Sequence, residues 1–168
     1  MKLISAILIV LLLVFAVSCG SSPPATGSVP ENNVGFSISA NHFVKNTYKG
    51  ETNPSYVLIR SYSSFDSLFG VASVMGMDKS KLISEEKMKS GFVFSIIYQG
   101  NDIHEFGIEK ITLKDKQLQV YYSSKVTEQN ASWSCNCHIT ALIDNCEFSS
   151  IVLFENGRPL PDAKIKEL

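Results

Sequence analysis

Reactive side chains are densest near the end of the chain, at Cys135, Cys137, His138 and Cys146. Paired thiols can form a disulfide, and three cysteines with one histidine are a known ligand set for zinc. Zinc ribbons place two residues between paired cysteines, whereas one residue separates Cys135 from Cys137. In an extended strand His138 would also point away from the face that both cysteines share. We therefore expect no metal site, and interpret Cys135, Cys137 and Cys146 as a candidate disulfide or thiol site.

The spacing of these cysteines limits the disulfides that they can form. If residues 137–143 are extended at about 3.3 Å per residue, Cys137 and Cys146 lie farther apart than the roughly 7 Å between Cα atoms that a disulfide tolerates. Either the chain folds back after Cys137, or the thiols stay reduced. A redox pair would need a thiol of lowered pKa, and the sequence around Cys135 offers neither a helix start nor a basic cluster. Buried cysteines or a structural bridge are favoured.

Other catalytic patterns are missing from the sequence. The three histidines, at positions 42, 104 and 138, are scattered. We find no Gly-x-Ser-x-Gly elbow, no His-Glu-x-x-His motif and no glycine-rich phosphate loop. We therefore expect no catalytic residues and no cofactor, and favour a binding or structural role over an enzyme.

Alternating apolar residues predict a β-rich domain. Residues 91–99 (GFVFSIIYQ) are apolar on both faces, which is typical of a central strand covered on both sides. A change of phase near Glu109 predicts a bulge in a hairpin, residues 125–131 are expected to form a polar loop, and the tail after Gly157 is polar. The predicted strands cover residues 35–40, 56–61, 91–99, 103–113, 117–123, 133–143 and 151–155.

One amphipathic helix is expected between the second and third of these strands. Ser63 and Asp66 have the spacing of a capping box, and Gly76 is a plausible end. A short helix could also begin at Ser84. The fold class is therefore a single α+β domain, a mostly antiparallel sheet with this helix packed on it. The apolar face of the helix consists of Phe65, Leu68, Phe69 and Ala72.

The start of the chain has the layout of an exported lipoprotein. Lys2 precedes an apolar run that ends near Val17, as in a secretory signal peptide. The following cut site, residues 16–19 (AVSC), resembles the bacterial lipobox, although Ala16 stands where a leucine is usual. This resemblance implies that residues 1–18 are removed and that Cys19 carries acyl chains such as palmitate, which anchor the protein to a membrane.

The composition divides the rest of the chain into a tether and a domain. Residues 19–34 are rich in Gly, Ser, Pro and Asn, and cannot bury enough apolar surface to fold alone. We interpret them as a flexible tether, followed by a β-rich globular domain at residues 35–168. The chain has 15 basic and 16 acidic residues and no basic stripe. This balance argues against nucleic acid as a partner.

Several segments resemble the C-terminal domain of the PrcB family, which comprises lipoprotein subunits of protease complexes. They read SYVLIRSYSSFDSLF, ISEEKMKSGFVFSIIYQG, FGIEKITLKDKQLQVYY, CHITALI and SSIVLFENG. The resemblance covers about residues 35–153 and depends mainly on apolar spacing. The chain departs from the family at residues 101–104 (NDIH), where a Thr-Gly-Gly-Tyr-like turn is usual, and at residues 135–137. The resemblance implies a non-catalytic domain that assembles with another envelope protein, for which a protease is the candidate.

Together these features predict a lipid-anchored protein of the bacterial cell envelope, in the outer membrane or at the cell surface rather than in the inner membrane. Its expected role is that of a non-catalytic binding or accessory subunit, with the membrane and an envelope protein as partners. Two alternatives stay open: an envelope thiol-redox or metal-binding protein that uses Cys135, Cys137 and His138, and a purely structural surface lipoprotein.

Overall fold

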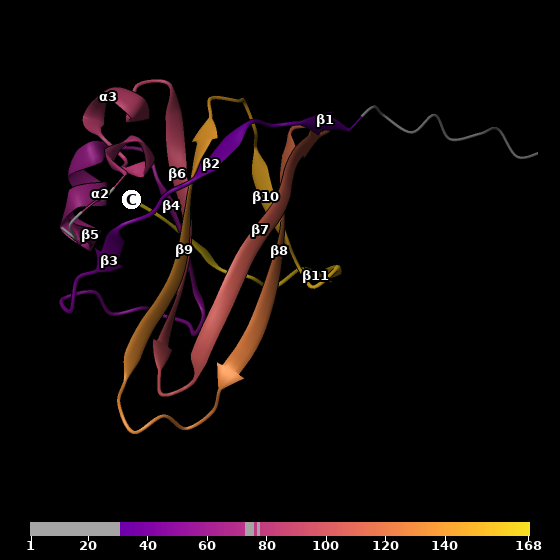
Figure 1. Ribbon diagram of the computed structural model, residues 1–168. Coiled ribbons are helices and arrows are strands. Elements are labelled where there is room, and N and C mark those ends of the chain that lie inside the picture. Colours follow the sequence, from indigo (N-terminus) through magenta and orange to yellow (C-terminus); the bar gives the residue numbers. More distant parts are fainter. Residues whose placement is uncertain (1–30, 73–75, 77) are drawn as a thin grey trace, which may run out of the picture.

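The computed structural model describes residues 31–72, 76 and 78–168. They form three layers: an outer sheet, a central sheet, and a layer of short helices and strands on the far side of the central sheet (Figure 1). Most strand pairs are antiparallel. The prediction of a single β-rich α+β domain is confirmed.

The central sheet has the strand order β12-β4-β6-β9-β2. Its middle strand, β6, pairs antiparallel with β4 on one side and with β9 on the other. The pairing with β9 runs from Gly91 opposite Asp144 to Gly100 opposite Cys135, so it spans all of both strands. The strand bounds are Phe36–Ile38 (β2), Ser55–Ile59 (β4), Gly91–Gly100 (β6), Cys135–Asp144 (β9) and Ile165–Glu167 (β12).

The outer sheet has the strand order β1-β7-β8-β10-β11 and is built on the long β7–β8 hairpin. The register of this hairpin shifts between Ile108 and Lys110, which confirms the bulge predicted near Glu109. Strand β10 pairs with β8 in parallel. The strand bounds are Asn32–Asn33 (β1), Ile103–Lys114 (β7), Gln117–Glu128 (β8), Ser150–Glu155 (β10) and Arg158–Leu160 (β11).

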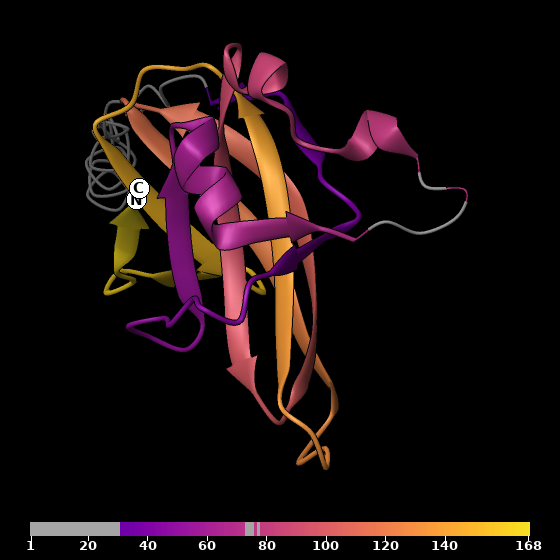
Figure 2. The same cartoon turned by 90° about the vertical axis from the view of Figure 1, so that its left-hand side faces the viewer.

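The third layer covers the face of the central sheet that is turned away from the outer sheet. Figure 2 looks onto this layer, with the longer helix in front of the central strands. Strands β3 and β5 pair antiparallel as a small separate sheet. The element bounds are His42–Val44 (β3), Tyr62–Leu68 (α2), Phe69–Val71 (β5), Lys79–Lys81 (η2, a 3₁₀ helix) and Glu85–Met88 (α3).

Helix α2 differs from its prediction at both ends. It is capped by Ser61, whose side chain accepts a hydrogen bond from the backbone N–H of Ser64 at 3.1 Å, and not by Ser63. It ends at Leu68, well before Gly76, because Phe69 begins strand β5 and tertiary pairing there overrides the helical periodicity. The short helix predicted to begin at Ser84 is present as α3.

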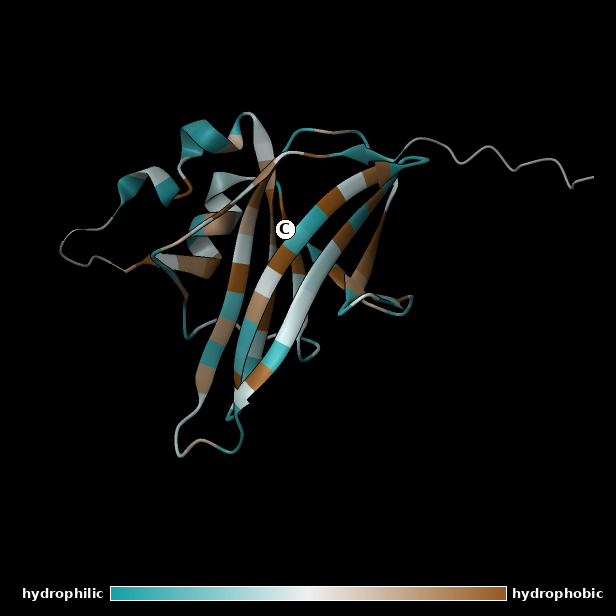
Figure 3. Ribbon diagram, turned by 45° about the vertical axis from the view of Figure 1, so that its right-hand side comes forward, coloured by the Kyte–Doolittle hydropathy of each residue, from teal (hydrophilic) through white to brown (hydrophobic). Residues whose placement is uncertain are grey.

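Strand β6 separates two hydrophobic clusters. Phe94 and Ile96 face the outer sheet, whereas Val93 and Ile97 face the helical layer, and all four are fully buried. The prediction that residues 91–99 form a central strand covered on both sides is therefore confirmed. Figure 3 shows the contrast with the long strands in the foreground, where hydrophobic and hydrophilic bands alternate, as on a sheet with one solvated face.

Three segments that were not predicted as strands belong to the sheets. Strand β8 continues to Glu128, so the first half of the loop expected at residues 125–131 is extended. The tail after Gly157 contributes β11 and β12, which pair with β10 and β4. Residues 32–33, assigned above to the tether, form β1 and pair with β7. The fold therefore begins slightly earlier than residue 35.

The predicted signal peptide, Cys19 and nearly all of the predicted tether lie within residues 1–30, outside the described residues. Within the part of the chain that the structure describes, no helix is long and apolar enough to cross a membrane.

Candidate functional site

Two cysteine side chains lie in contact at the start of β9. Cys135 and Cys137 are two residues apart on an extended strand, so both point to the same face. That face looks toward the outer sheet, because Ile139 and Ala141 continue it into the core between the sheets. The sulfur atoms of Cys135 and Cys137 are 3.2 Å apart. The extended strand therefore brings together Cys135 and Cys137, two of the three cysteines of the predicted thiol site.

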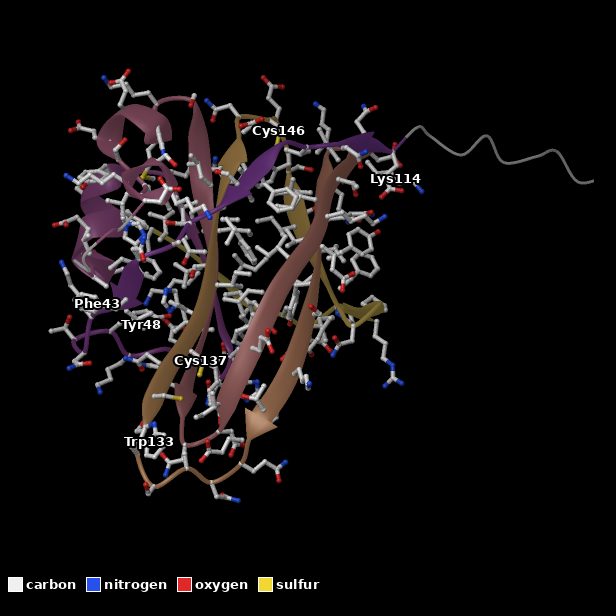
Figure 4. All side chains as sticks on the ribbon, in the orientation of Figure 1. Phe43, Tyr48, Lys114, Trp133, Cys137 and Cys146 are labelled. Carbon is white, nitrogen blue, oxygen red and sulfur yellow. The ribbon has the colours of Figure 1, made fainter. Side chains whose placement is uncertain are left out.

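The backbone of the β6–β7 turn surrounds this thiol pair. The thiol of Cys135 donates a hydrogen bond to the backbone carbonyl of Asp102 at 3.4 Å. The backbone N–H of His104 donates to the sulfur of Cys137 at 3.3 Å. The His104 ring packs on Tyr98, with 3.9 Å between ring centroids, and Tyr98 is directly opposite Cys137 in the sheet. The pair therefore lies at one end of the two sheets, near Trp133 (Figure 4).

The electrostatic environment keeps the first thiol protonated. Burial and the neighbouring Cys137 thiol raise the pKa of Cys135 to about 11. Burial also raises the pKa of the Tyr98 hydroxyl, and the carboxylate of Asp102 acts in the same direction. At neutral pH Cys135 is therefore a thiol, and its hydrogen bond to Asp102 is available to hold the side chain in place.

The other two residues of the sequence-predicted group lie elsewhere. His138 points to the opposite face of β9 and packs against Phe69, 5.6 Å between ring centroids. Cys146 follows the far end of β9 and packs against the core between the sheets. All three described cysteines are free in the structure. Among the described residues, no three His, Cys, Asp or Glu side chains are grouped as metal ligands.

Sequence reasoning missed the partners of the thiol pair. Asp102 and His104 contribute backbone atoms, which any residue type could supply, so the sequence does not indicate them. Tyr98 lies in a predicted strand, and nothing in the sequence distinguishes it from the other strand residues. The signal that could have found them is the turn at residues 100–102, since it joins β6, the neighbour of β9, to β7. The register that places Gly100 opposite Cys135 cannot be predicted from the sequence of β6 or of β9 alone.

A second group of titratable side chains lies on the other face of β9. His42 is 9% exposed, its Nδ1 is 2.8 Å from the Ser39 hydroxyl, and its Nε2 has no hydrogen-bond partner among the described residues. Its ring meets Phe65 edge-on. Burial lowers the pKa of His42, and the nearby His138 and Lys87 lower it further. Burial likewise lowers the pKa of His138.

These two histidines should make the fold sensitive to mild acid. Because each pKa is lower in the folded state, the unfolded chain binds the protons more readily, and stability falls as the pH drops below the unfolded value of about 6.5. Each histidine should contribute a slope of up to about 1.4 kcal/mol per pH unit until its folded pKa is passed. Urea unfolding between pH 7.5 and pH 5 measures this slope, and equal slopes for the native chain and for His42→Gln/His138→Gln would contradict it.

A surface hollow beside α2 is a weaker candidate for a functional site than the thiol pair. It encloses about 520 Å³ and includes Arg60, Asp66, Glu85 and Lys89 in its lining. Charges of both signs therefore mix along its wall. Arg60 is already paired with Glu167 and stacks on aromatic rings, and Lys89 is paired with Glu86. We interpret this hollow as a solvated charged surface.

The most exposed large apolar side chain of the described residues lies beside the thiol pair. Trp133, in the loop between β8 and β9, is 57% exposed. The loop is fixed to the β6–β7 turn, because the backbone N–H of Asn130 donates to the Asp102 carboxylate at 2.9 Å and that of Ala131 donates to the Asn101 carbonyl at 2.8 Å. Trp133 is therefore presented to solvent from a fixed loop.

We define the sandwich tip as the loop with Trp133, the β6–β7 turn and the thiol pair. Comparisons of the chain with protein-family models, with curated proteins and with solved structures found no match. The tip combines an exposed aromatic side chain, suited to contact with another protein, and a thiol pair, suited to two-electron oxidation.

Proposed function

We propose that the protein is a lipid-anchored component of the bacterial cell envelope that binds another envelope protein through its sandwich tip. The anchor is inferred from the lipobox-like residues 16–19 and the apolar run before them. The observation that carries the binding role is the exposure of Trp133 on a fixed loop. Tryptophan is among the side chains that contribute most to binding energy at protein interfaces, and a fixed loop loses little conformational entropy on binding.

The position of the tip in the fold supports this role. The predicted tether enters the domain at β1, which pairs with Thr112 and Leu113 at one end of the long β7–β8 hairpin. Trp133 lies at the opposite end, as the labelled positions of Lys114 and Trp133 show (Figure 4). Strand β7 has 12 residues, and at about 3.3 Å per residue such a strand is roughly 40 Å long. A protein anchored at its start would therefore present Trp133 away from the membrane.

The sequence supports one class of partner. The likeness to the PrcB C-terminal domain favours an envelope protease as the partner, and the accessory role that goes with it is non-catalytic. The departures from that family, at residues 101–104 and 135–137, fall within the sandwich tip. A partner bound there would meet a surface particular to this chain.

Replacing Trp133 by serine should abolish partner binding and leave the fold intact. Tagged native chain and Trp133→Ser would be expressed in the source bacterium, crosslinked, and recovered from mildly solubilised envelopes for quantitative mass spectrometry. We expect a stoichiometric envelope protein with the native chain and at least about a ten-fold loss with the variant, since a central tryptophan can contribute more than 2 kcal/mol.

Phe43→Ser is the matched control. Phe43 is another exposed aromatic side chain, 48% exposed, but it lies on β3 in the helical layer. This variant should recover the partner as the native chain does. Equal recovery by Trp133→Ser, or a native chain that recovers no stoichiometric partner, would contradict the proposed function. A protease among the recovered proteins would support the finer proposal about the partner.

A further inference from the structure

The binding role is argued from Trp133, whereas the thiol pair at the start of β9 can undergo a reaction that binding does not require. We propose that Cys135 and Cys137 form a reversible intramolecular disulfide by thiol–disulfide exchange, with the disulfide of a small thiol or of another envelope protein as the oxidant. This inference does not depend on the proposed function. It replaces the Cys135–Cys137–His138 group suggested by the sequence, because His138 faces the other way.

The strand brings the two sulfur atoms into contact, and a local contraction of the strand at residues 135–137 closes the bond. Residues two apart on a strand have Cα atoms about 6.6 Å apart, at the upper end of the range of about 4.4–6.8 Å found for disulfides, and the bond also needs Cβ atoms about 3.5–4.5 Å apart. The sulfur atoms of Cys135 and Cys137 already lie 3.2 Å apart on one face. The pair lies at the first residues of β9, opposite Gly100 and Tyr98, so the contraction is confined to the end of the pairing of β9 with β6.

The surroundings give the two cysteines different roles. The backbone N–H of His104 points at the sulfur of Cys137 and can stabilise negative charge there, so Cys137 is the attacking residue. Burial and the second thiol raise the pKa of Cys135 to about 11, and its thiol is hydrogen-bonded to the Asp102 carbonyl. Cys135 is thus suited to stay protonated until a mixed disulfide forms beside it, and then to resolve it.

The exchange balances in two steps. The Cys137 thiolate, its proton lost to solvent, attacks one sulfur of the oxidant; that S–S bond breaks, and the leaving thiolate takes up a proton. Cys135 then loses its proton to solvent and attacks the Cys137 sulfur of the mixed disulfide as a thiolate; the S–S bond to the oxidant breaks, and the second leaving thiolate takes up a proton. Two protein thiols are oxidised to one disulfide, and the incoming disulfide is reduced to two thiols.

Cys146 provides an internal comparison. It is half-buried, as the pair is, but lies past the other end of β9, where burial raises the pKa of its thiol. Strand β9 is extended from Cys135 to Asp144, so Cys146 cannot reach either member of the pair without unfolding the strand. Among the described cysteines, oxidation of the native fold should therefore be confined to Cys135 and Cys137.

In the test, the full chain is reduced, freed of reductant and exposed to excess glutathione disulfide. Remaining thiols are then blocked with maleimide, and the modified cysteines are identified by peptide mass mapping. We expect a Cys135–Cys137 disulfide, an alkylated Cys146, and no lasting glutathione adduct on the pair. Trp133 is the sole tryptophan of the chain and lies two residues before Cys135. Its fluorescence should change with the same time course and recover on addition of dithiothreitol.

Serine variants separate the two roles. Cys135→Ser should stop at a stable glutathione adduct on Cys137, whereas Cys137→Ser should react about ten-fold more slowly or less, since its remaining thiol is largely protonated. Cys146→Ser should behave as the native chain. Lasting adducts on both cysteines of the native chain, a bond from either to Cys146, or an unreacted pair would each overturn the proposal, whatever the variants do.

Discussion

Replacing Phe94 by alanine is expected to lower the free energy of unfolding by about 3–5 kcal/mol. The side chain is fully buried in the middle of β6 and belongs to the cluster between the two sheets. It is directly opposite Leu58 on β4 and Ala141 on β9, also buried. With regular sheet on either side, the backbone has little freedom to close the resulting cavity. The loss is a large fraction of the 5–15 kcal/mol that typically stabilises a domain.

Urea unfolding at pH 7.5, followed by circular dichroism, measures this loss as a fall in the midpoint at constant slope. Phe43→Ala is the control with the same change of side chain. Because Phe43 is 48% exposed, its loss should cost about 1 kcal/mol or less. Equal destabilisation by the two variants would show that β6 is not the centre of the core.

The sequence predicted β6 correctly because its signal is local. A strand that is apolar on both faces must be covered on both faces, whatever the covering elements are, and this fixes its place in the middle layer. The bulge near Glu109 was equally local, since it shows as a change of phase within one hairpin.

Elements whose existence depends on distant partners could not be predicted in this way. Helix α2 ends at Leu68 because the next residues pair with β3, about 25 positions earlier in the chain. Strands β11 and β12 are short and largely polar, and they are strands because β10 and β4 offer edges to them. Their hydrogen bonds are decided by topology, and alternation within three residues carries almost no signal.

The thiol site also has one part that local sequence predicts and one part that depends on distant residues. That Cys135 and Cys137 share a face follows from strand geometry, and so does the exclusion of His138 from their group. The contacts to Asp102 and His104 follow from the register of three strands, which the sequence does not specify. The exposure of Trp133 could not be predicted from the sequence either, because a tryptophan next to a strand can be a core residue or a surface residue.

Replacing Cys19 by serine is expected to abolish lipid attachment and, where residues 1–18 are still removed, to release the protein from the membrane completely. If the lipobox-like residues are processed as we propose, Cys19 is the sole attachment point for acyl chains, and serine offers no thiol for the first lipid. Acyl chains contribute about 0.8 kcal/mol per buried methylene, so the loss of two or more chains removes stable binding. The change lies outside the described residues, and their fold should be unaffected.

Metabolic labelling with an alkyne-bearing fatty acid, followed by fractionation of the envelope, measures both lipid attachment and membrane retention. The native chain and Cys146→Ser should label and sediment with membranes, whereas Cys19→Ser should do neither. A Cys19→Ser chain that still takes up the fatty-acid label would contradict the lipid anchor. Because binding at the tip is assigned to Trp133, at the opposite end of the sandwich from β1, solubilised Cys19→Ser should still capture its partner in vitro. Loss of capture together with the anchor would show that the tether side of the domain also contributes to binding.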